Sequence, residues 1–286
     1  GFVSVMGMAG EHFAIGLYRG ERGLDGFWSI QERAPFFEPE DLLNTPQLQA
    51  SFEDREELEK HDRDLIKTLG LKYRGKQAWP MFRSFCPGYA PWHIEADEAR
   101  FLAHALGQLL EVAPRVQKDP DILDNDDDRY LVRVAQKTSA GLVWKDETQT
   151  IKESPPITLD ITIKPVLLEK LHRLPKVKNK IEADFFMVPS MIGARGERPY
   201  FPYMVLLVES KSGAVIGTEL LQPFPSLEAM WAKVGTTALE QLVKVGVLPG
   251  EIRVRSSLLY GALAAFNREL GIKVKQSQRL PQLDMA

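Results

Sequence analysis

The stretch PYMVLLVESKSGAVIGTELL, residues 202–221, contains the clearest structural pattern in the chain. Two runs rich in valine, leucine and isoleucine flank the dipeptide Ser212-Gly213. Short apolar runs joined by a glycine-containing turn are typical of a β-hairpin, because glycine adopts the positive φ angles that tight turns require. Residues 202–209 and 214–221 are therefore predicted to be neighbouring antiparallel strands.

The chain on both sides of this hairpin continues the pattern. A strand is predicted before the hairpin at residues 184–192, and two more after it, through Ile252 and Val254 and at 272–275. One helix is predicted before each of these later strands, because apolar residues recur there at intervals of three and four. Their apolar residues are Leu227, Met230, Trp231 and Val234 in the first and Leu259, Leu263, Phe266 and Leu270 in the second. The resulting order is β-β-β-α-β-α-β.

The first half of the chain also predicts strands mixed with helices. Alternating residues indicate a hairpin over 2–20 and a half-buried strand over 48–53, and the apolar stripe of 95–112 predicts a helix. Further elements are expected at 58–69 (helix), 71–74 (strand), 130–136 and 142–151 (a strand pair). We therefore assign the protein to the α/β class, with α+β elements in the N-terminal half and two mixed-sheet domains.

Domain boundaries follow from length and composition. A chain of 286 residues fits two domains, at about 100–200 residues each. We expect an N-terminal domain at 1–151, a linker or hinge at 152–178 around Pro155-Pro156 and a basic stretch, and a C-terminal domain at 179–286. Similar motifs recur 201 residues apart, as in Ile15-Gly16 and Ile216-Gly217, so an internal duplication is possible.

Composition excludes several classes of site. The net charge of -3 gives no overall attraction for polyanions, and the single cysteine, Cys86, rules out internal disulfides. No apolar run is long enough to span a membrane, so we expect a cytoplasmic protein. Neither of the common glycine-rich phosphate loops is present, and we expect no cofactor. Asp124, Asp126 and Asp128 are interpreted as a solvated acidic loop, because the glycine and glutamate of a calcium-binding loop are missing.

The C-terminal order of elements resembles the ribonuclease-H-like fold. That resemblance implies a carboxylate on the first strand and another at the end of the fourth, which together hold two metal ions. Asp184 stands at the first position, but Arg255 stands where the second acid belongs, and we expect no room after the last strand for a terminal helix with a third. Asp184 and Glu209 remain weak metal candidates. No catalytic residue is assigned, and a non-catalytic or repurposed member of the fold is expected.

Two surfaces are candidates for binding. In the last two strands, apolar residues alternate with Arg253, Arg255, Lys273 and Lys275, so these four basic residues face the same way. They predict a basic sheet face, which either binds an anion or is a solvated face that prevents aggregation.

The second surface is the aromatic loop from Phe82 to Trp92, which is rich in aromatic residues and proline. Arg83 could stack on Tyr89 or Trp92 and line a ligand pocket. The alternative is an aromatic plug that seals the edge of a domain.

Four segments carry a resemblance to a known family: Gly10-Glu11-His12-Phe13, Ser51-Phe52-Glu53-Asp54-Arg55, the aromatic loop, and the run from Arg198 to Tyr203. They resemble an uncharacterised bacterial family in which two domains of unknown function occur together. The resemblance implies a bacterial cytosolic protein and supplies no activity, cofactor or catalytic residue.

Three hypotheses about function remain open. The first, which we favour, is a non-catalytic binding module that uses the basic sheet face or the aromatic loop to bind a protein or an anionic ligand. The second is a metal-dependent enzyme that processes nucleic acids with a rearranged site around Asp184. The third is an enzyme for small molecules, which requires a pocket of roughly 300–1,000 Å³.

Overall fold

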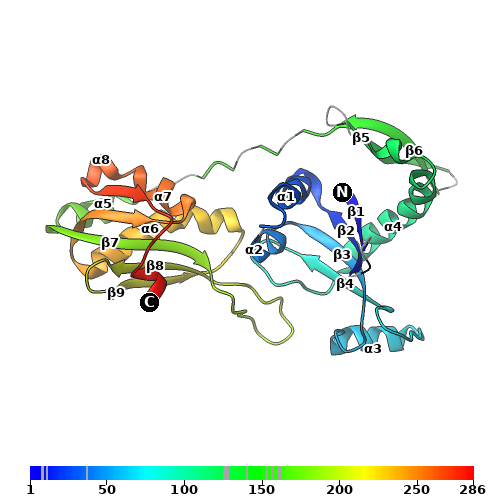
Figure 1. Ribbon diagram of the computed structural model, residues 1–286, viewed down its shortest axis with the longest axis horizontal. Helices are drawn as coiled ribbons and strands as arrows, with labels where there is room; N and C mark the ends of the chain where they lie inside the picture. Colours follow the sequence, from blue (N-terminus) through cyan, green and yellow to red (C-terminus); the bar gives the residue numbers. More distant parts are fainter. Residues whose placement is uncertain are drawn as a thin grey trace. The chain divides into compact units, whose positions relative to one another are not determined.

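The structure, a computed structural model, describes residues 1–7, 10, 12–36, 38–124, 129–139, 141–152, 154–155, 157–159 and 163–286. These residues form two compact units, 1–86 with 91–155, and 87–90 with 156–286 (Figure 1). The acidic loop expected around Asp126 and Asp128 lies outside the described residues. No helix in the described ranges has the length and apolar character needed to cross a membrane.

The first unit is built on a four-stranded sheet with the order β1-β2-β3-β4. Its strands are β1 (Phe2–Met6), β2 (Phe13–Tyr18), β3 (Gln47–Glu53) and β4 (Trp79–Phe85). Its helices are α1 (Gly20–Arg33), α2 (Pro39–Leu43), α3 (Lys60–Thr68), α4 (Ala96–Val116) and the short η1 (Pro120–Leu123). A separate two-stranded hairpin consists of β5 (Arg129–Thr138) and β6 (Gly141–Thr150).

All neighbouring strands of the first sheet are antiparallel, so the prediction of a mixed sheet was wrong for this unit. The reason lies in the connection from β2 to β3. The backbone N–H of Arg19 donates to the carbonyl of Pro46, and Tyr18 at the end of β2 pairs with Gln47 at the start of β3. The two helices between these strands therefore return the chain to the end of the sheet that it left, and β3 runs back along β2.

One face of this sheet packs against α4. Leu102 of α4 is buried against Leu17 and Leu48, and Ala105 and Leu106 extend the contact. The helix continues past Val112, where we predicted its end, because Pro114 falls in its last turn and removes only one helical hydrogen bond.

The strand predicted at 71–74 is absent from the structure. Residues 71–74 follow the left-handed Gly70 that ends α3, and Leu71 is largely exposed. The outer edge of β4 pairs instead with Trp92, through Ser84. The sequence pattern could not show that another segment occupies this edge.

The second unit contains a five-stranded sheet with the order β11-β10-β7-β8-β9. Its strands are β7 (Lys176–Met187), β8 (Tyr203–Glu209), β9 (Val215–Leu221), β10 (Leu248–Val254) and β11 (Lys273–Gln276). Its helices are α5 (Pro165–His172), α6 (Leu227–Val245), α7 (Ser257–Ala264), α8 (Asn267–Leu270) and the short η3 (Leu283–Met285).

Strands β7, β8 and β9 are antiparallel neighbours, whereas β10 is parallel to β7 and β11 is parallel to β10. Strand β10 begins on the far side of β7 because the chain returns to it through α6. The sheet thus differs from the first in both strand order and direction, and the repeated motifs do not correspond to a shared sheet topology.

The range that we expected to be a hinge, 152–178, holds α5 and the start of β7. Leu167 and Leu171, four residues apart on α5, are buried in the core of the second unit. The exposed lysines at the start of β7 concealed the strand, because they interrupt its apolar alternation.

The helices α5, α6 and α7 pack on one face of the second sheet. The core there includes Ile181 and Ala183 of β7, Ile252 of β10 and Leu239 of α6. In β7 the alternate residues Glu182 and Asp184 face the other way. The sheet therefore has an apolar face beneath the helices and a polar face opposite.

Part of that polar face is covered by the C-terminal strap, which we define as residues 277–286. In Figure 1 this segment crosses the sheet before it ends at the label C. Leu280 and Leu283 are buried against Leu206 and Val208 of β8. Glu182 accepts hydrogen bonds from the backbone N–H groups of Gln282 and Leu283, at 2.8 and 3.0 Å, and so fixes the first turn of η3.

Candidate functional site

The polar face of the second sheet brings charged residues from three strands together. Glu251 of β10 pairs in register with Lys180 of β7 on one side and Lys273 of β11 on the other. One step along, Arg253 pairs with Lys275. Directly paired residues project from the same face of a sheet, so the sheet positions these side chains beside one another.

Glu251 lies at the centre of this arrangement. Its carboxylate is 3.0 Å from Arg253 Nε, 3.1 Å from Lys275 Nζ and 4.0 Å from Lys180 Nζ. We call Lys180, Arg253, Lys273 and Lys275, with Glu251 between them, the basic face. The side chain of Glu251 is only 11% exposed, whereas those of Lys180 and Lys275 are 52% and 47% exposed. The cations therefore form the outer layer and the carboxylate lies beneath them.

Charge balance on the basic face favours an anion. Lys180, Arg253 and Lys275 surround the Glu251 carboxylate, and exposed Lys273 is a fourth cation on this face. Buried Glu182, the register partner of Arg253, is a second carboxylate, so four cations and two carboxylates leave an excess of two positive charges. Burial opposes the charge of Glu251, but hydrogen bonds from Arg253 and Lys275, together with the positive charges of Lys275 and Lys180, outweigh burial and lower its pKa. Glu251 is thus an anion at neutral pH, and Arg253 and Lys275 hold its carboxylate beneath the cations.

Arg255 does not join the basic face but binds two carboxylates. Its guanidinium contacts Asp184 at 2.7 Å and Asp284 of η3 at 2.7 Å. Burial opposes the charge of Arg255, but its hydrogen bonds to Asp284 and Asp184 outweigh burial and raise its pKa. Arg255 is therefore a cation that links β7 to the C-terminal strap.

The remaining acceptor capacity of Asp184 is used by the backbone. Its second oxygen accepts hydrogen bonds from the N–H groups of Phe185 at 2.9 Å and Ser256 at 3.1 Å. Ser256 is the N-cap of α7, so the carboxylate lies at a helix N-terminus, where negative charge is stabilised. Asp184 is a fully hydrogen-bonded structural anion.

Two expectations about carboxylates need correction. The chain does have room for a terminal helical turn with an acid, because η3 carries Asp284 to Arg255. Glu209 lies away from Asp184: it pairs in register with Ile181, whereas Asp184 pairs with Leu206. The Glu209 carboxylate accepts hydrogen bonds from the hydroxyl and N–H of Ser212, which lower its pKa. Among the described residues, no group of three or more acids, histidines or cysteines is arranged to hold a metal ion.

The aromatic loop is divided between the two units. Residues 87–90 belong to the second, in which the N–H of Ala90 donates to the carbonyl of Pro199 and that of Phe201 to Gly88. Tyr89 pairs with Tyr200 there, and its hydroxyl lies 3.5 Å from the carbonyl oxygen of Pro223. Arg83 and Trp92 belong to the first unit.

Arg83 does not stack on the aromatic residues but makes a buried ion pair. Its guanidinium binds both oxygens of Asp62, at 2.9 and 2.7 Å, and lies 3.5 Å from Glu59. Burial opposes the charge of Asp62, but Arg83 outweighs it and lowers the carboxyl pKa. This geometry joins β4 to the N-terminus of α3, and we assign it a structural role.

His93 lies beside this ion pair. The centroid of its ring lies 4.1 Å from that of His61, and its Nε2 lies 3.4 Å from Oε2 of Glu59. Burial, then the neighbouring His61 and Arg83, lowers the pKa of His93, so its ring is neutral at pH 7. The rings of Trp92 and His93 are 5.0 Å apart, so Trp92 packs against this cluster.

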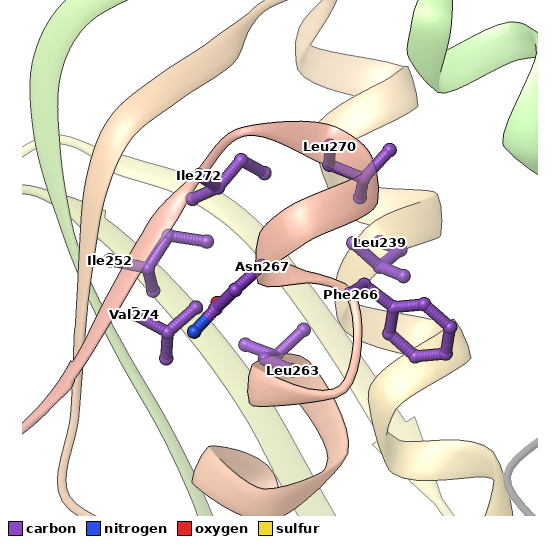
Figure 2. Close-up of a pocket in the computed structure, with 8 residues that line it drawn as sticks. All are labelled: Leu239, Ile252, Leu263, Phe266, Asn267, Leu270, Ile272 and Val274. Atoms are coloured by element: carbon purple, nitrogen blue, oxygen red, sulfur yellow. The ribbon is translucent and has the colours of Figure 1, made fainter.

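An apolar pocket lies between α7, α8 and the sheet of the second unit (Figure 2). Figure 2 shows Leu263, Ile272 and Val274 around the side chain of Asn267, whose Oδ1 is buried without a hydrogen-bond partner. The space in it that a water-sized molecule can occupy is about 10 Å³, far smaller than the pockets that bind drug-sized ligands. It is a packing defect of the core, and it does not support the hypothesis of a small-molecule enzyme.

Sequence reasoning found Asp184 but missed Glu251, Glu182 and Asp284. Glu251 and Arg253 alternate in β10, so the period of two could have placed Glu251 on the basic face. Glu182 could have been found in the same way beside Asp184. Asp284 could not, because its position depends on the path of the strap after the last strand.

Comparison with known families divides the chain near the boundary between its two units. Residues 1–133 match the model described as Domain of unknown function (DUF7309), and residues 167–286 match the model described as Domain of unknown function (DUF6930). The first match covers most of the first unit together with residues 87–90 of the second unit, and the second match falls within the second unit. No curated protein matches the chain. The chain is thus similar to two domain families of unknown function, side by side, and its function is uncharacterised.

Proposed function

We propose that the second unit is a non-catalytic binding module with a ribonuclease-H-like arrangement, and that its basic face binds an anionic ligand or partner. The strand order supports the arrangement: three antiparallel strands, β7 to β9, are followed by β10 and β11 on the other side of β7 and parallel to it. The observation that carries the function is the group of cations around buried Glu251.

The state of Asp184 supports a non-catalytic role. An acid that binds catalytic metal ions keeps oxygens available, whereas both oxygens of Asp184 are used by Arg255, Phe185 and Ser256. Arg255 also supplies the positive charge that a metal ion would bring to Asp184 and Asp284. The guanidinium thus stabilises the pair of carboxylates without leaving a position for a reacting group.

Binding to the basic face is tested with pyrophosphate as the probe. In calorimetric titrations of the full chain, the Lys180→Gln/Lys275→Gln variant should lose about tenfold in affinity, which corresponds to about 1.4 kcal/mol. The control, Lys233→Gln, removes an exposed charge from α6 and should bind as the wild type does. Affinity should also fall between 50 mM and 200 mM salt, because exposed charges are screened. Equal affinities for the two variants would refute the proposal.

A second candidate function is a metal-dependent enzyme with a rearranged site, because Asp184 and Asp284 converge on one cation as carboxylates do around a metal ion. This candidate predicts that MnCl₂ raises the melting temperature of the wild type, by mass action on the folded state. The non-catalytic module predicts no such rise, because Arg255 already neutralises both acids.

A further inference from the structure

We propose that the partner of the basic face is an extended acidic peptide that adds to the sheet as a strand next to β11. This inference rests on the proposed function and names its ligand class. Strand β11 ends the sheet, with β10 as its neighbour on the inner side. The outer edge of such a strand presents backbone N–H and C=O groups that can pair with an incoming extended chain.

The side chains of β11 give the edge its chemical preference. Val274 is 9% exposed and points into the core, whereas Lys273 and Lys275 are exposed on the polar face. Lys275 is paired with Glu251 at 3.1 Å, and within the described ranges Lys273 has no ion pair. In an added strand, side chains directly opposite lie about 4.5–5.5 Å away between Cβ atoms. Aspartate or glutamate at every second position would therefore face the two lysines.

Three other ligands could be considered for the edge of β11: a second copy of the chain, single-stranded nucleic acid and a small phosphate. A second copy of the chain, paired through β11, would place lysines beside lysines, and directly opposed like charges are destabilising. Single-stranded nucleic acid is bound through aromatic side chains that stack on bases, yet β10 and β11 contain no aromatic residue. A small phosphate could use the cations but would leave the backbone edge unused.

The opposite edge of the sheet shows that the charges are specific to β11. Strand β9 exposes Val215 and Leu220, at 51% and 50%, and has glutamate as its one charged residue. The Glu219 side chain is paired with Lys244 and Gln241 of α6. Thus only β11 combines a terminal position in this sheet with exposed cations on a face that is already positive.

Fluorescence anisotropy with two labelled peptides tests the inference on the full chain. One is an eight-residue peptide of alternating aspartate and valine, and the other is the same peptide methylated on every backbone nitrogen. The two have equal charge, but the methylated peptide has no N–H donors. The unmodified peptide should bind at least about tenfold more tightly, because it alone can donate backbone hydrogen bonds to β11. Because both peptides meet the same protein, a folding defect cannot produce this difference.

Reversing the charge of the two lysines of β11 provides a second test of the inference. Lys273→Glu/Lys275→Glu should abolish binding of the unmodified peptide, and the matched control Lys233→Glu should retain it. Equal affinity for the two peptides, with pyrophosphate still bound, would overturn strand addition and leave the proposed function intact. If neither the peptides nor pyrophosphate bind to the wild type, the proposed function is refuted as well.

Discussion

Removal of Arg255 tests whether Asp184 is a structural anion. The Asp184 side chain is 5% exposed and that of Arg255 is 36% exposed, so the pair is partly shielded from water. Breaking a fully buried ion pair costs about 3–5 kcal/mol, and a hydrogen bond to a charged group contributes about 1.5–3 kcal/mol. Asp184 keeps the N–H donors of Phe185 and Ser256 when Arg255 is replaced. We therefore expect Arg255→Met to destabilise the second unit by about 2 kcal/mol.

The reciprocal change distinguishes the structural role from a metal-binding one. Asp184→Asn removes the negative charge that Arg255 and the N-terminus of α7 stabilise, so it should also cost about 2 kcal/mol. The double variant should cost less than the sum of the two, because the interaction is lost only once. If Asp184 were instead kept for a metal ion, Asp184→Asn should stabilise the protein, because loss of such a carboxylate usually raises the stability of the metal-free form.

Native-state hydrogen exchange of the full chain provides the readout, because it reports the free energy of opening for each segment. Amides of β7 and β10 should exchange about thirtyfold faster in either single variant, which corresponds to about 2 kcal/mol. The control is Arg268→Met, which alters an exposed arginine on α8. Unchanged or slower exchange in Asp184→Asn would refute the assignment of Asp184 as a structural anion.

Three further predictions concern the strap, the histidine cluster and the central acid. Leu283→Ala should destabilise the strap by about 2–4 kcal/mol, seen as faster exchange of β8 amides, whereas Met285→Ala, at an exposed position, should have little effect. The pKa of His93 is lowered on folding, so below a pH of about 6.5 the unfolded histidine gains a proton more readily than the folded one. The first unit should therefore lose stability as the pH falls below that value. Between pH 7.5 and 5.5, the melting temperature of His93→Phe should fall less than that of the wild type. Glu251→Gln should raise the affinity for pyrophosphate several-fold in calorimetric titrations, since it removes the anion beneath the cations, and an unchanged affinity would argue against this site.

The sequence predicted the second unit better than the first. The hairpin at 202–221 and the helices after it have strong periodic patterns, and the observed order is β7-β8-β9-α6-β10-α7-α8-β11. It differs from the predicted order in that the helix expected from Leu259 to Leu270 is divided into α7 and α8. The start of β7 was missed because the lysines there mask the strand period. In the first unit, the direction of β3 depends on how α1 and α2 return the chain, and local patterns do not contain that information.

The site was predictable only in part. Alternation placed Arg253, Lys273 and Lys275 on one face, and the structure brings Lys180 to the same face from a segment expected to be a hinge. The partners of Arg255 depend on the path of the strap. Contacts between residues far apart in sequence, such as Asp184 with Arg255 or Arg83 with Asp62, result from tertiary packing and have no local signature.

The most direct test of the central claim is a titration of the ¹⁵N-labelled full chain with pyrophosphate, followed by NMR. Binding to the basic face predicts chemical-shift changes that are concentrated in β10 and β11 and around Lys180 of β7, and that disappear at high salt. Shifts confined to the first unit, or no shifts at millimolar pyrophosphate, would contradict the account.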